Sequence, residues 1–394
     1  MRGFFYTKAA TLAFLSLSSA QTLPEDLDKA IADYDSLSTF RSILSAAPQV
    51  LIETLSDQGS NITVLIPTNE AIKSYLKDAE VSDVTELNQT DLKIFFSYHI
   101  LSASLESSDF DQERGLSVPT LLQSSEFNNR TAGPQIQSQF GKDAGGQVVF
   151  ASKGKRSGKR AAGDISGPTV DIRAGMEQNV QMTAVDGSWG AKNASKFQVV
   201  DKVLLPPRPC STTVQNTGDK RLTALNGALN KAGLWPALDA SKNVTCLAPS
   251  TQAFKDAGSP DVKLSKQDLG GALLAHTLDE VTYSNYLRDG QVIGTLNKTE
   301  VKVTIRGDDI YFNNAKVIEA NVLTNNGLIH ILDSVIEAGG KPNGTGTGTA
   351  SATSSESEPT SSSTTVSSDK GNSGGSLTVG LWPLSALITA YMLF

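Results

Sequence analysis

The sequence has few of the residues from which most catalytic and metal centres are built. Its 394 residues include two cysteines, Cys210 and Cys246, and three histidines, His99, His276 and His330. The histidines are too far apart to form a local ligand motif such as HExxH, and the cysteines lack zinc-site spacing. A dinucleotide-binding GxGxxG motif and a P-loop are also missing. These absences favour a protein that is not an enzyme and that binds no metal or cofactor.

Basic character is lacking as well, because the formal net charge is −7. An acidic chain offers no overall electrostatic attraction to nucleic acid. The hydrophobic content of 39% is nevertheless high enough for packed cores, and the length suits two ordinary domains with additional segments. We therefore expect two domains and no nucleic-acid partner.

The N-terminus has the pattern of a secretory signal. Arg2 and Lys8 supply positive charge, and an apolar run follows from Ala9 to Leu17. Small residues then lead to Ala20, after which a signal peptidase could cut. We predict that residues 1–20 are a signal peptide.

The C-terminus has a second targeting pattern. Residues 377–394 carry no charge and end the sequence, and small residues precede them. This pattern is typical of a GPI-attachment signal, with the lipid on Asn372 or, as a second choice, Gly371. The propeptide would be residues 373–394. A single transmembrane helix is the alternative, but a proline and a glycine interrupt the run and no Lys or Arg follows it.

Residues 339–372 are rich in Ser, Thr and Gly and poor in apolar residues. Such a segment cannot bury enough surface to offset its chain entropy, so we expect a disordered, O-glycosylated stalk. The secretory signal also gives weight to seven N-x-Ser/Thr sequons. They lie at Asn61, Asn88, Asn129, Asn193, Asn243, Asn297 and Asn343.

The chain between these ends contains an internal duplication. Three pairs of similar segments occur in the same order: Thr63–Ile72 and Val244–Phe254, Phe95–Leu101 and Leu273–Leu278, and Phe197–Pro207 and Leu328–Ala338. The distance from the histidine segment to the terminal segment is shorter in the second unit than in the first. The first unit therefore contains an insertion, at about residues 102–167. The first unit would then be residues 21–208 and the second residues 209–338.

A basic run at residues 153–160 lies within the insertion. We interpret it as a solvated loop, although cleavage by a kexin-like protease or binding of an acidic wall polymer would also suit it.

Local patterns predict the elements at the start of each unit. A short buried strand ends at Pro67 or Pro249, because proline cannot donate to a ladder. Thr68 and Asn69, and likewise the pair Ser250 and Thr251, are good caps for a helix that follows. A second helix should run from Thr90, or from Ser265, to each unit's first histidine. Alternating strands and an Asn326-Gly327 turn should complete the second unit.

The two units resemble the fasciclin domain family. The strand and Pro-Thr-Asn corner of that family match Thr63–Ile72 and, more loosely, Val244–Phe254. The central Tyr-His motif matches Tyr98 and His99, whereas alanine precedes His276. The resemblance covers roughly residues 24–207 and 211–338.

The terminal motif of the family, Asn-Gly-x-Ile-His-x-x-Asp, occurs in the second unit alone. It matches Asn326, Gly327, Ile329, His330 and Asp333. The first unit has Phe197–Asp201 in its place, without the Asn-Gly pair or the histidine.

The resemblance implies an α+β fold, with two tandem fasciclin-like domains that are each a strand wedge with packed helices. It also implies a non-enzymatic surface glycoprotein that binds cell-surface or matrix proteins or wall polysaccharides. Its place would be the outer face of the plasma membrane, held there by the GPI lipid, or the cell wall. In animal members the Tyr-His region is linked to integrin contact, so Tyr98 and His99 are the candidate adhesion motif.

The histidines have a structural interpretation as well, in which each is partly buried and bonded to backbone. Cys210 and Cys246 would lie in an oxidising compartment, and an even count favours a disulfide between them. Two free buried thiols are the alternative.

Overall fold

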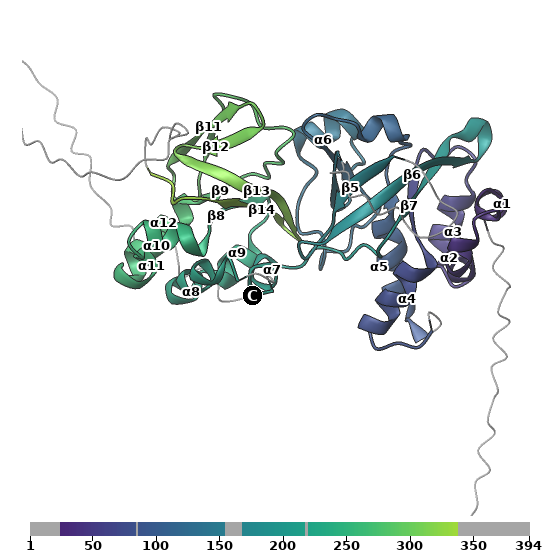
Figure 1. The fold of residues 1–394 in the computed structure, drawn as a ribbon, viewed down its shortest axis with the longest axis horizontal. Helices are drawn as coiled ribbons and strands as arrows, with labels where there is room; N and C mark the ends of the chain where they lie inside the picture. The colour runs from purple at the N-terminus through teal and green to yellow at the C-terminus, as the bar shows by residue number, and fades with distance from the viewer. Residues whose placement is uncertain (1–23, 84–85, 154–167, 217–219, 338–394) are drawn as a thin grey trace, which may run out of the picture. The chain divides into compact units, whose positions relative to one another are not determined.

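The computed structural model describes residues 24–83, 86–153, 168–216 and 220–337 (Figure 1). The expected signal peptide, stalk, GPI segment and Asn343 lie outside these residues, as does nearly all of the basic run. All of these described residues belong to one compact unit. Within it we call residues 24–208 domain 1 and residues 209–337 domain 2.

Domain 1 contains a seven-stranded sheet. Its strands are β1 (Thr63–Pro67), β2 (Ile100–Leu101), β3 (Leu116–Pro119), β4 (Val148–Lys153), β5 (Thr169–Arg173), β6 (Asn179–Trp189) and β7 (Ser195–Val200). Their order is β2-β1-β7-β6-β5-β4-β3. Only the β1–β7 pair is parallel. A bridge between Leu101 and Thr120 brings the two edges together, so the sheet is nearly closed.

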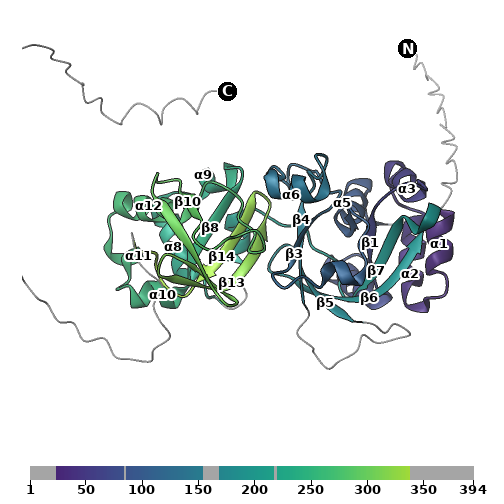
Figure 2. The ribbon, with the colours of Figure 1, turned by 90° about the horizontal axis from the view of Figure 1, so that it is seen from above.

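Domain 2 repeats this sheet. Its strands are β8 (Val244–Pro249), β9 (Thr277–Leu278), β10 (Val292–Gly294), β11 (Glu300–Arg306), β12 (Asp309–Phe312), β13 (Ala315–Thr324) and β14 (Gly327–Leu332). The order β10-β11-β12-β13-β14-β8-β9 is that of domain 1 read from the other edge, and β8–β14 is again the parallel pair. The duplication predicted from the sequence is therefore a duplication of topology (Figures 1 and 2).

Most helices of each domain pack beside the parallel pair of its sheet. Domain 1 has α1 (Glu25–Ile31), η1 (Asp35–Leu37), α2 (Ser38–Leu44), α3 (Gln49–Ser56), α4 (Asn69–Asp78), α5 (Gln89–His99), η3 (Ser107–Phe110), α6 (Gly133–Phe140) and η4 (Ala191–Asn193). Domain 2 has α7 (Cys210–Gln215), α8 (Thr223–Ala232), α9 (Trp235–Ala240), α10 (Thr251–Asp256), α11 (Pro260–Lys263) and α12 (Lys266–Ala275). Among the described residues, no helix combines the length and apolar character needed to cross a membrane.

Each sheet separates two apolar clusters. In domain 1, Phe40 and Phe96 from the helices pack with Val64 and Phe197 of the parallel pair. The other face of that sheet has its own cluster, which includes Tyr98. Domain 2 shows the same division. These cores position the ends of β7 and β14, where the polar residues described below lie.

The first residue after the proline that ends each domain's first strand caps the following helix, as predicted. Thr68 Oγ1 accepts a hydrogen bond from Ala71 N (3.2 Å), and Ser250 Oγ accepts one from Ala253 N (3.1 Å). Side chains that accept backbone N–H groups in this way are N-caps. The cap predictions for α4 and α10 are therefore confirmed.

The next residue of each corner has a different role from the predicted one. Asn69 Oδ1 accepts the backbone N–H of Thr39 (2.8 Å), and Thr251 Oγ1 accepts that of Ala224 (3.2 Å). Asn69 and Thr251 therefore satisfy the first turn of the neighbouring helix, α2 or α8, instead of their own. This correction concerns a tertiary contact, which local propensity does not encode.

The insertion in domain 1 consists of two separate segments. Residues 120–147 connect β3 to β4, whereas residues 295–299 connect the equivalent β10 and β11. Residues 154–168 connect β4 to β5, whereas residues 307–308 do so in domain 2. Residues 102–115 have a counterpart in 279–291, so the insertion begins later than the expected residue 102. The first segment carries α6.

The backbones of β14 and β8 approach each other closely at Gly327, and a substitution there tests this contact. A Cβ atom at this position would lie 1.8 Å from the carbonyl oxygen of Val244. We expect Gly327→Ala to lower the free energy of unfolding by about 2 kcal/mol or more, because backbone must move. The control is Gly271→Ala in α12, where a Cβ meets nothing within 4 Å. That change should raise stability by about 0.5–1 kcal/mol. Urea unfolding measures both, and equal effects would contradict the prediction.

Candidate functional site: histidine connections and the domain contact

His99 joins the end of α5 to the segment that follows β7. Its Nδ1 bonds the carbonyl oxygen of Phe95 (2.7 Å), and its Nε2 accepts the backbone N–H of Leu204 (2.9 Å). An N–H donor can meet Nε2 only if that nitrogen is unprotonated, so the network assigns the proton to Nδ1. The imidazole is completely buried.

His276 makes the same connection in domain 2. Its Nδ1 bonds the carbonyl oxygen of Ala272 (2.8 Å), and its Nε2 accepts the N–H of Ile336 (2.9 Å). The equivalence of the two histidines therefore extends from their place in the sequence to both hydrogen bonds.

His330 of β14 has a different counterpart. Its Nε2 donates to the carbonyl oxygen of Thr282 (2.8 Å), and Asn321 N lies 3.4 Å from its Nδ1. In the same register of β7 stands Gln198, because Gln198 pairs with Leu65 as His330 pairs with Leu247.

Gln198 reproduces the bonding pattern of the histidine. Its Oε1 accepts the N–H of Val185 (2.8 Å), and its Nε2 donates to Leu105 O (3.4 Å) and to Asp186 Oδ1 (2.9 Å). A neutral amide thus replaces a neutral imidazole. Sequence comparison missed Gln198, because the motif search looked for a histidine.

Two buried threonines also have matching roles that the sequence analysis missed. Thr63 Oγ1 donates to Ala103 O (2.7 Å) and accepts Leu105 N (2.8 Å). Thr245 Oγ1 donates to Glu280 O (2.8 Å) and accepts Thr282 N (2.9 Å). Both residues are also the third positions of sequons, so their hydroxyls have a structural role whether or not a glycan is attached.

The other residues of the terminal motif are structural in the same sense. Asn326 Nδ2 donates to the carbonyl oxygens of Leu238 and Ser241, both at 2.8 Å, and so fixes the end of α9. Asp333 Oδ1 accepts Lys316 N (2.8 Å), just as Asp201 Oδ1 accepts Gln181 N (2.8 Å) in domain 1.

Burial keeps all three imidazoles neutral. It lowers the pKa of His99 and of His330 to about 4 and lowers the pKa of His276, against the opposing effect of the backbone carbonyl that each ring bonds. A general acid or base works best when its pKa is near the operating pH. These histidines are therefore unsuited to proton transfer near neutrality. No group of acidic, histidine or cysteine side chains among the described residues could hold a metal ion.

The candidate adhesion motif is inaccessible in the folded chain. Tyr98 and His99 both have 0% exposure. The Tyr98 hydroxyl donates to the carbonyl oxygen of Val148 (3.2 Å), and burial raises the pKa of this phenol. A partner could contact these two side chains only after local unfolding, so the folded chain does not present the candidate adhesion motif at its surface.

An apolar cluster and a polar network connect the two domains. The cluster contains residues of both domains: Ala132, Ile136, Ala144 and Val148, together with Tyr283, Leu323 and Leu328. Residues 120–147 contribute much of it. The same segment places Asn129 N 2.6 Å from Asn325 O, and Asn325 Nδ2 donates to Glu126 O (3.0 Å). The insertion of domain 1 is therefore a contact segment for domain 2.

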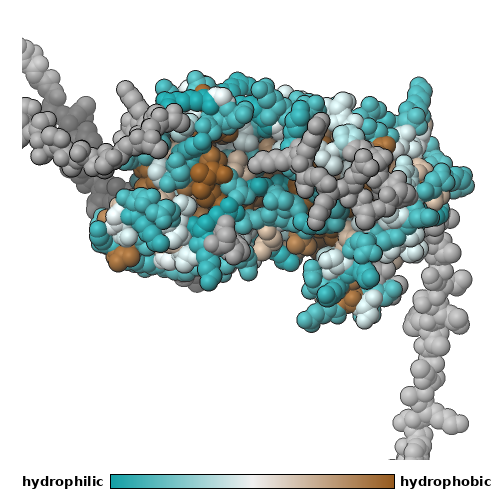
Figure 3. Space-filling view, in the orientation of Figure 1, coloured by the Kyte–Doolittle hydropathy of each residue, from teal (hydrophilic) through white to brown (hydrophobic). Residues whose placement is uncertain are grey.

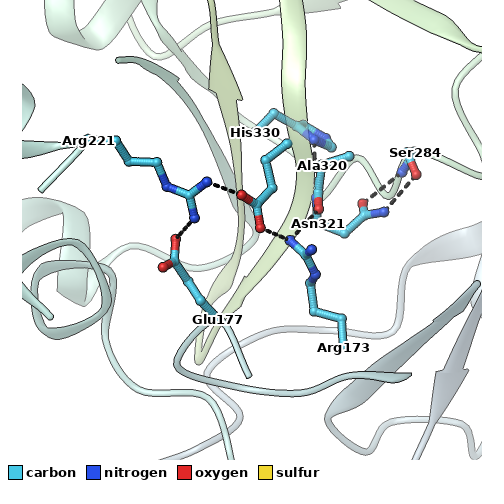
Figure 4. A network of polar contacts seen from close by, with 8 residues as sticks. Arg173, Glu177, Arg221, Ser284, Ala320, Asn321 and His330 are labelled. Atoms are coloured by element: carbon cyan, nitrogen blue, oxygen red, sulfur yellow. Dashed lines mark hydrogen bonds and ion pairs between the residues drawn. The ribbon is translucent and has the colours of Figure 1, made fainter. Parts of the chain in front are cut away.

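Charged residues alternate in sign across the contact (Figure 4). Arg173 of β5 pairs with Glu319 of β13 (2.6 Å) and donates to Ala320 O (3.0 Å). Glu319 also pairs with Arg221, which pairs with Glu177 of domain 1 (2.9 Å). Their side chains are 15–27% exposed, so the network is shielded without being dry. It favours one orientation of the domains more than it adds stability.

The sequons differ in exposure. Asn61, Asn88, Asn193 and Asn297 are exposed, whereas Asn129 and Asn243 are half-buried at the domain contact. The face shown in Figure 3 is mostly polar, with separate apolar patches. Scattered apolar residues of this kind are normal on the surface of a monomeric protein.

The family model described as the Fasciclin domain matches residues 35–148 and 220–338. The chain belongs to the fasciclin domain family. The matched ranges coincide with most of domains 1 and 2, so the two tandem fasciclin domains with α+β content predicted from the motifs are confirmed.

Fungal relatives cover both domains. A protein named "Fasciclin-like arabinogalactan protein" from Arthroderma benhamiae is 26% identical over 82% of this chain and 69% of its own length. "Fasciclin-like arabinogalactan protein elcF" from Phaeosphaeria nodorum is 26% identical over 82% of this chain and 92% of its own length. A solved FAS1 domain pair from the insect cell adhesion molecule Fasciclin I covers 76% of this chain and 96% of its own, at 15% identity and a TM-score of 0.34.

The titration of His330 gives a prediction about pH. Unfolded histidine binds a proton below about pH 6.5, whereas folded His330 does so only near pH 4. The unfolded state therefore holds more protons between these values. The free energy of unfolding should fall as pH falls through this window, by about 1.4 kcal/mol per pH unit for such a histidine.

His330→Gln should remove this part of the pH slope and cost only about 1 kcal/mol at pH 7, because Gln198 shows that an amide can make both bonds. His330→Leu should cost about 2–4 kcal/mol, because Thr282 O and Asn321 N lose their partner. Urea unfolding at pH 4.5, 5.5 and 7 tests both variants. An unchanged slope in His330→Gln would show that this imidazole is not the titrating group.

The cysteines allow a separate prediction. Cys210 of α7 and Cys246 of β8 are both buried thiols with their Sγ atoms 3.6 Å apart. This proximity would let the predicted disulfide form with little rearrangement. We expect thiol titration of the secreted, denatured, non-reduced protein to find no free thiol, and reduction to lower stability by roughly 3–4 kcal/mol. Two titratable thiols would refute the disulfide.

Proposed function

We propose that this protein is a non-enzymatic cell-surface glycoprotein that acts in cell adhesion or in contact between the cell and its matrix or wall. The tandem fasciclin fold is the observation that carries the proposal. Fungal relatives that align with most of this chain have names that refer to fasciclin-like arabinogalactan proteins. The buried, neutral histidines support a role without proton-transfer chemistry.

The proposed location follows from the sequence of the two ends. A signal peptide at residues 1–20 would send the chain into the secretory pathway, and a GPI lipid at Asn372 would hold it at the outer membrane face or lead it to the wall. The stalk of residues 339–372 would then keep the folded domains away from the lipid. Exposed sequons support the same compartment.

Adhesion by such a protein would depend on many weak contacts. Each copy would present its two domains on a flexible stalk. Many copies on one cell would raise the effective concentration of binding domains at a facing surface. The partner would be a surface protein, a matrix protein or a wall polysaccharide.

A structural wall component that binds polysaccharide is the second candidate. A groove of about 670 Å³ supports it, because side chains that hydrogen-bond lie beside apolar ones along its walls. Among them are Ser152, Asn179, Asn321, Phe150 and Ile310. Polysaccharides present both hydroxyl groups and apolar ring faces, which such walls can bind.

Gene deletion tests the proposal directly. We expect deletion to reduce cell aggregation or attachment to a surface, and re-expression of the full sequence to restore it. Treatment of intact cells with a phosphatidylinositol-specific phospholipase should release the protein and produce the same defect. Normal adhesion under several growth conditions would count against the adhesive role.

A pull-down with the secreted 21–338 fragment separates the two candidates. Binding to insoluble glucan or chitin that is lost when groove residue Asn179 is changed to a bulky Trp would favour the wall component. Binding to intact cells, without binding to either polymer, would favour protein-mediated adhesion. Gln252→Trp, at an exposed position of α10 outside the groove and outside any sequon, is the control.

A further inference from the structure

Asn243 lies in the wall of a cavity at the domain contact. The cavity has a volume of about 210 Å³ and lies between the start of α6 and residues 279–286. A water molecule takes about 30 Å³ of liquid volume, so a group of several non-hydrogen atoms fits there. Because Asn243 begins a sequon, a sugar attached to it would enter or border this space.

The amide of Asn243 is already oriented. Its Oδ1 accepts hydrogen bonds from the backbone N (2.7 Å) and the Oγ1 (3.2 Å) of Thr131. Its Nδ2 has no hydrogen-bond partner among the described residues. A sugar on Nδ2 would therefore remove no existing bond, and Oδ1 could still hold Thr131. Attachment and the domain contact are compatible.

The cavity wall has the chemistry that binds a pyranose. The ring of Tyr286 is half-buried there, and its hydroxyl bonds Gln139 Oε1 of α6 (2.8 Å). Asp279 and Glu280 also line the cavity, and their carboxylates have no hydrogen-bond partner among the described residues. An aromatic ring can stack on the apolar face of a sugar, and carboxylates accept bonds from its hydroxyl and acetamido groups.

The electrostatics at the cavity agree with this assignment. Burial, and then the nearby charge of Asp279, raise the pKa of Glu280. Among the described residues neither carboxylate forms a salt bridge, and such a pair gains from neutral hydrogen-bond donors. The first turn of α6 also has no side-chain cap, so its backbone N–H groups, apart from the position of Pro134, which has none, could donate to sugar oxygens.

We propose that Asn243 carries an N-linked glycan whose first N-acetylglucosamine occupies this cavity and joins the two domains. A lipid-linked oligosaccharide diphosphate is the donor. The sugar C1 forms a bond to Nδ2, the bond from C1 to the diphosphate oxygen breaks, and the proton of Nδ2 leaves with the lipid diphosphate. The inference rests on the secretory route of the proposed function, but it does not depend on adhesion.

Asn297 is a matched comparison within the same domain. It is exposed on the turn between β10 and β11 and lines none of the described cavities. A glycan at Asn297 should extend into solvent. The two sites therefore differ in whether the first sugar has a protein surface to contact.

Glycopeptide mass spectrometry of the secreted full-length protein is the first test. We expect sugar on Asn243, and we expect native protein to resist glycoamidase at Asn243 while Asn297 loses its glycan. Tyr286→Ala should make the Asn243 glycan cleavable, and Tyr286→Phe, which keeps the ring, should not. Sugar on Asn297 with none on Asn243 would overturn the inference alone. No sugar on any sequon would overturn the secretory route with it.

Hydrogen exchange tests the joining role. Asn243→Asp keeps an oxygen acceptor for Thr131 but cannot be glycosylated. We expect amide exchange in peptides covering 130–140 and 279–287 to become about fivefold faster or more in this variant, as for loss of an ordinary stabilising interaction. Asn297→Asp should leave these rates unchanged. Equal rates in wild type and Asn243→Asp would mean that the sugar does not join the domains.

Discussion

A neutral imidazole, buried where a helix ends, holds the closing segment of each domain in place. His99 and His276 each bond a carbonyl oxygen one turn back in their own helix and accept an N–H from the segment after the last strand. A protonated ring would have no lone pair for that N–H, and a buried charge would be costly. The bonds require the parallel pair β1–β7, or β8–β14, to bring the helix end and the closing segment together. The topology of both sheets is thus linked to the charge state of one side chain.

The same principle explains how domain 1 keeps the fold without the motif histidine. At the position of His330 in β14, β7 has Gln198, and both side chains offer one donor and one acceptor without charge. The acceptor meets an irregular stretch of the neighbouring strand, β6 or β13, where the register shifts. What the site requires is therefore a neutral group with a donor and an acceptor, which two residue types can provide. A motif that requires a histidine at this position therefore does not detect that Gln198 and His330 have the same role.

Sequence reasoning reached the features that depend on local chemistry. Pro67 and Thr68 mark the end of a strand and the cap of the next helix within a few residues, so their roles can be read from the chain. Asn69 looks equally suited to capping, yet it bonds a residue thirty positions earlier, and no local pattern predicts this. Gln147 and Asn325 are polar residues buried at the domain contact, where hydrophobic periodicity gives no signal. The insertion was predicted from spacing, but its division into two segments required the strand register.

The asymmetry between the copies follows from what the domain contact needs. Residues 120–147 are much longer than residues 295–299, the equivalent connection of domain 2, and they supply much of the surface that contacts domain 2. The apolar cluster around Ile136 and Leu323 provides burial, which is the larger stabilising term. The partly shielded ions of Arg173 and Glu319 add little net energy, but they penalise any orientation that leaves them unpaired. Because this long segment occurs in one copy, the two domains contact each other through unlike surfaces.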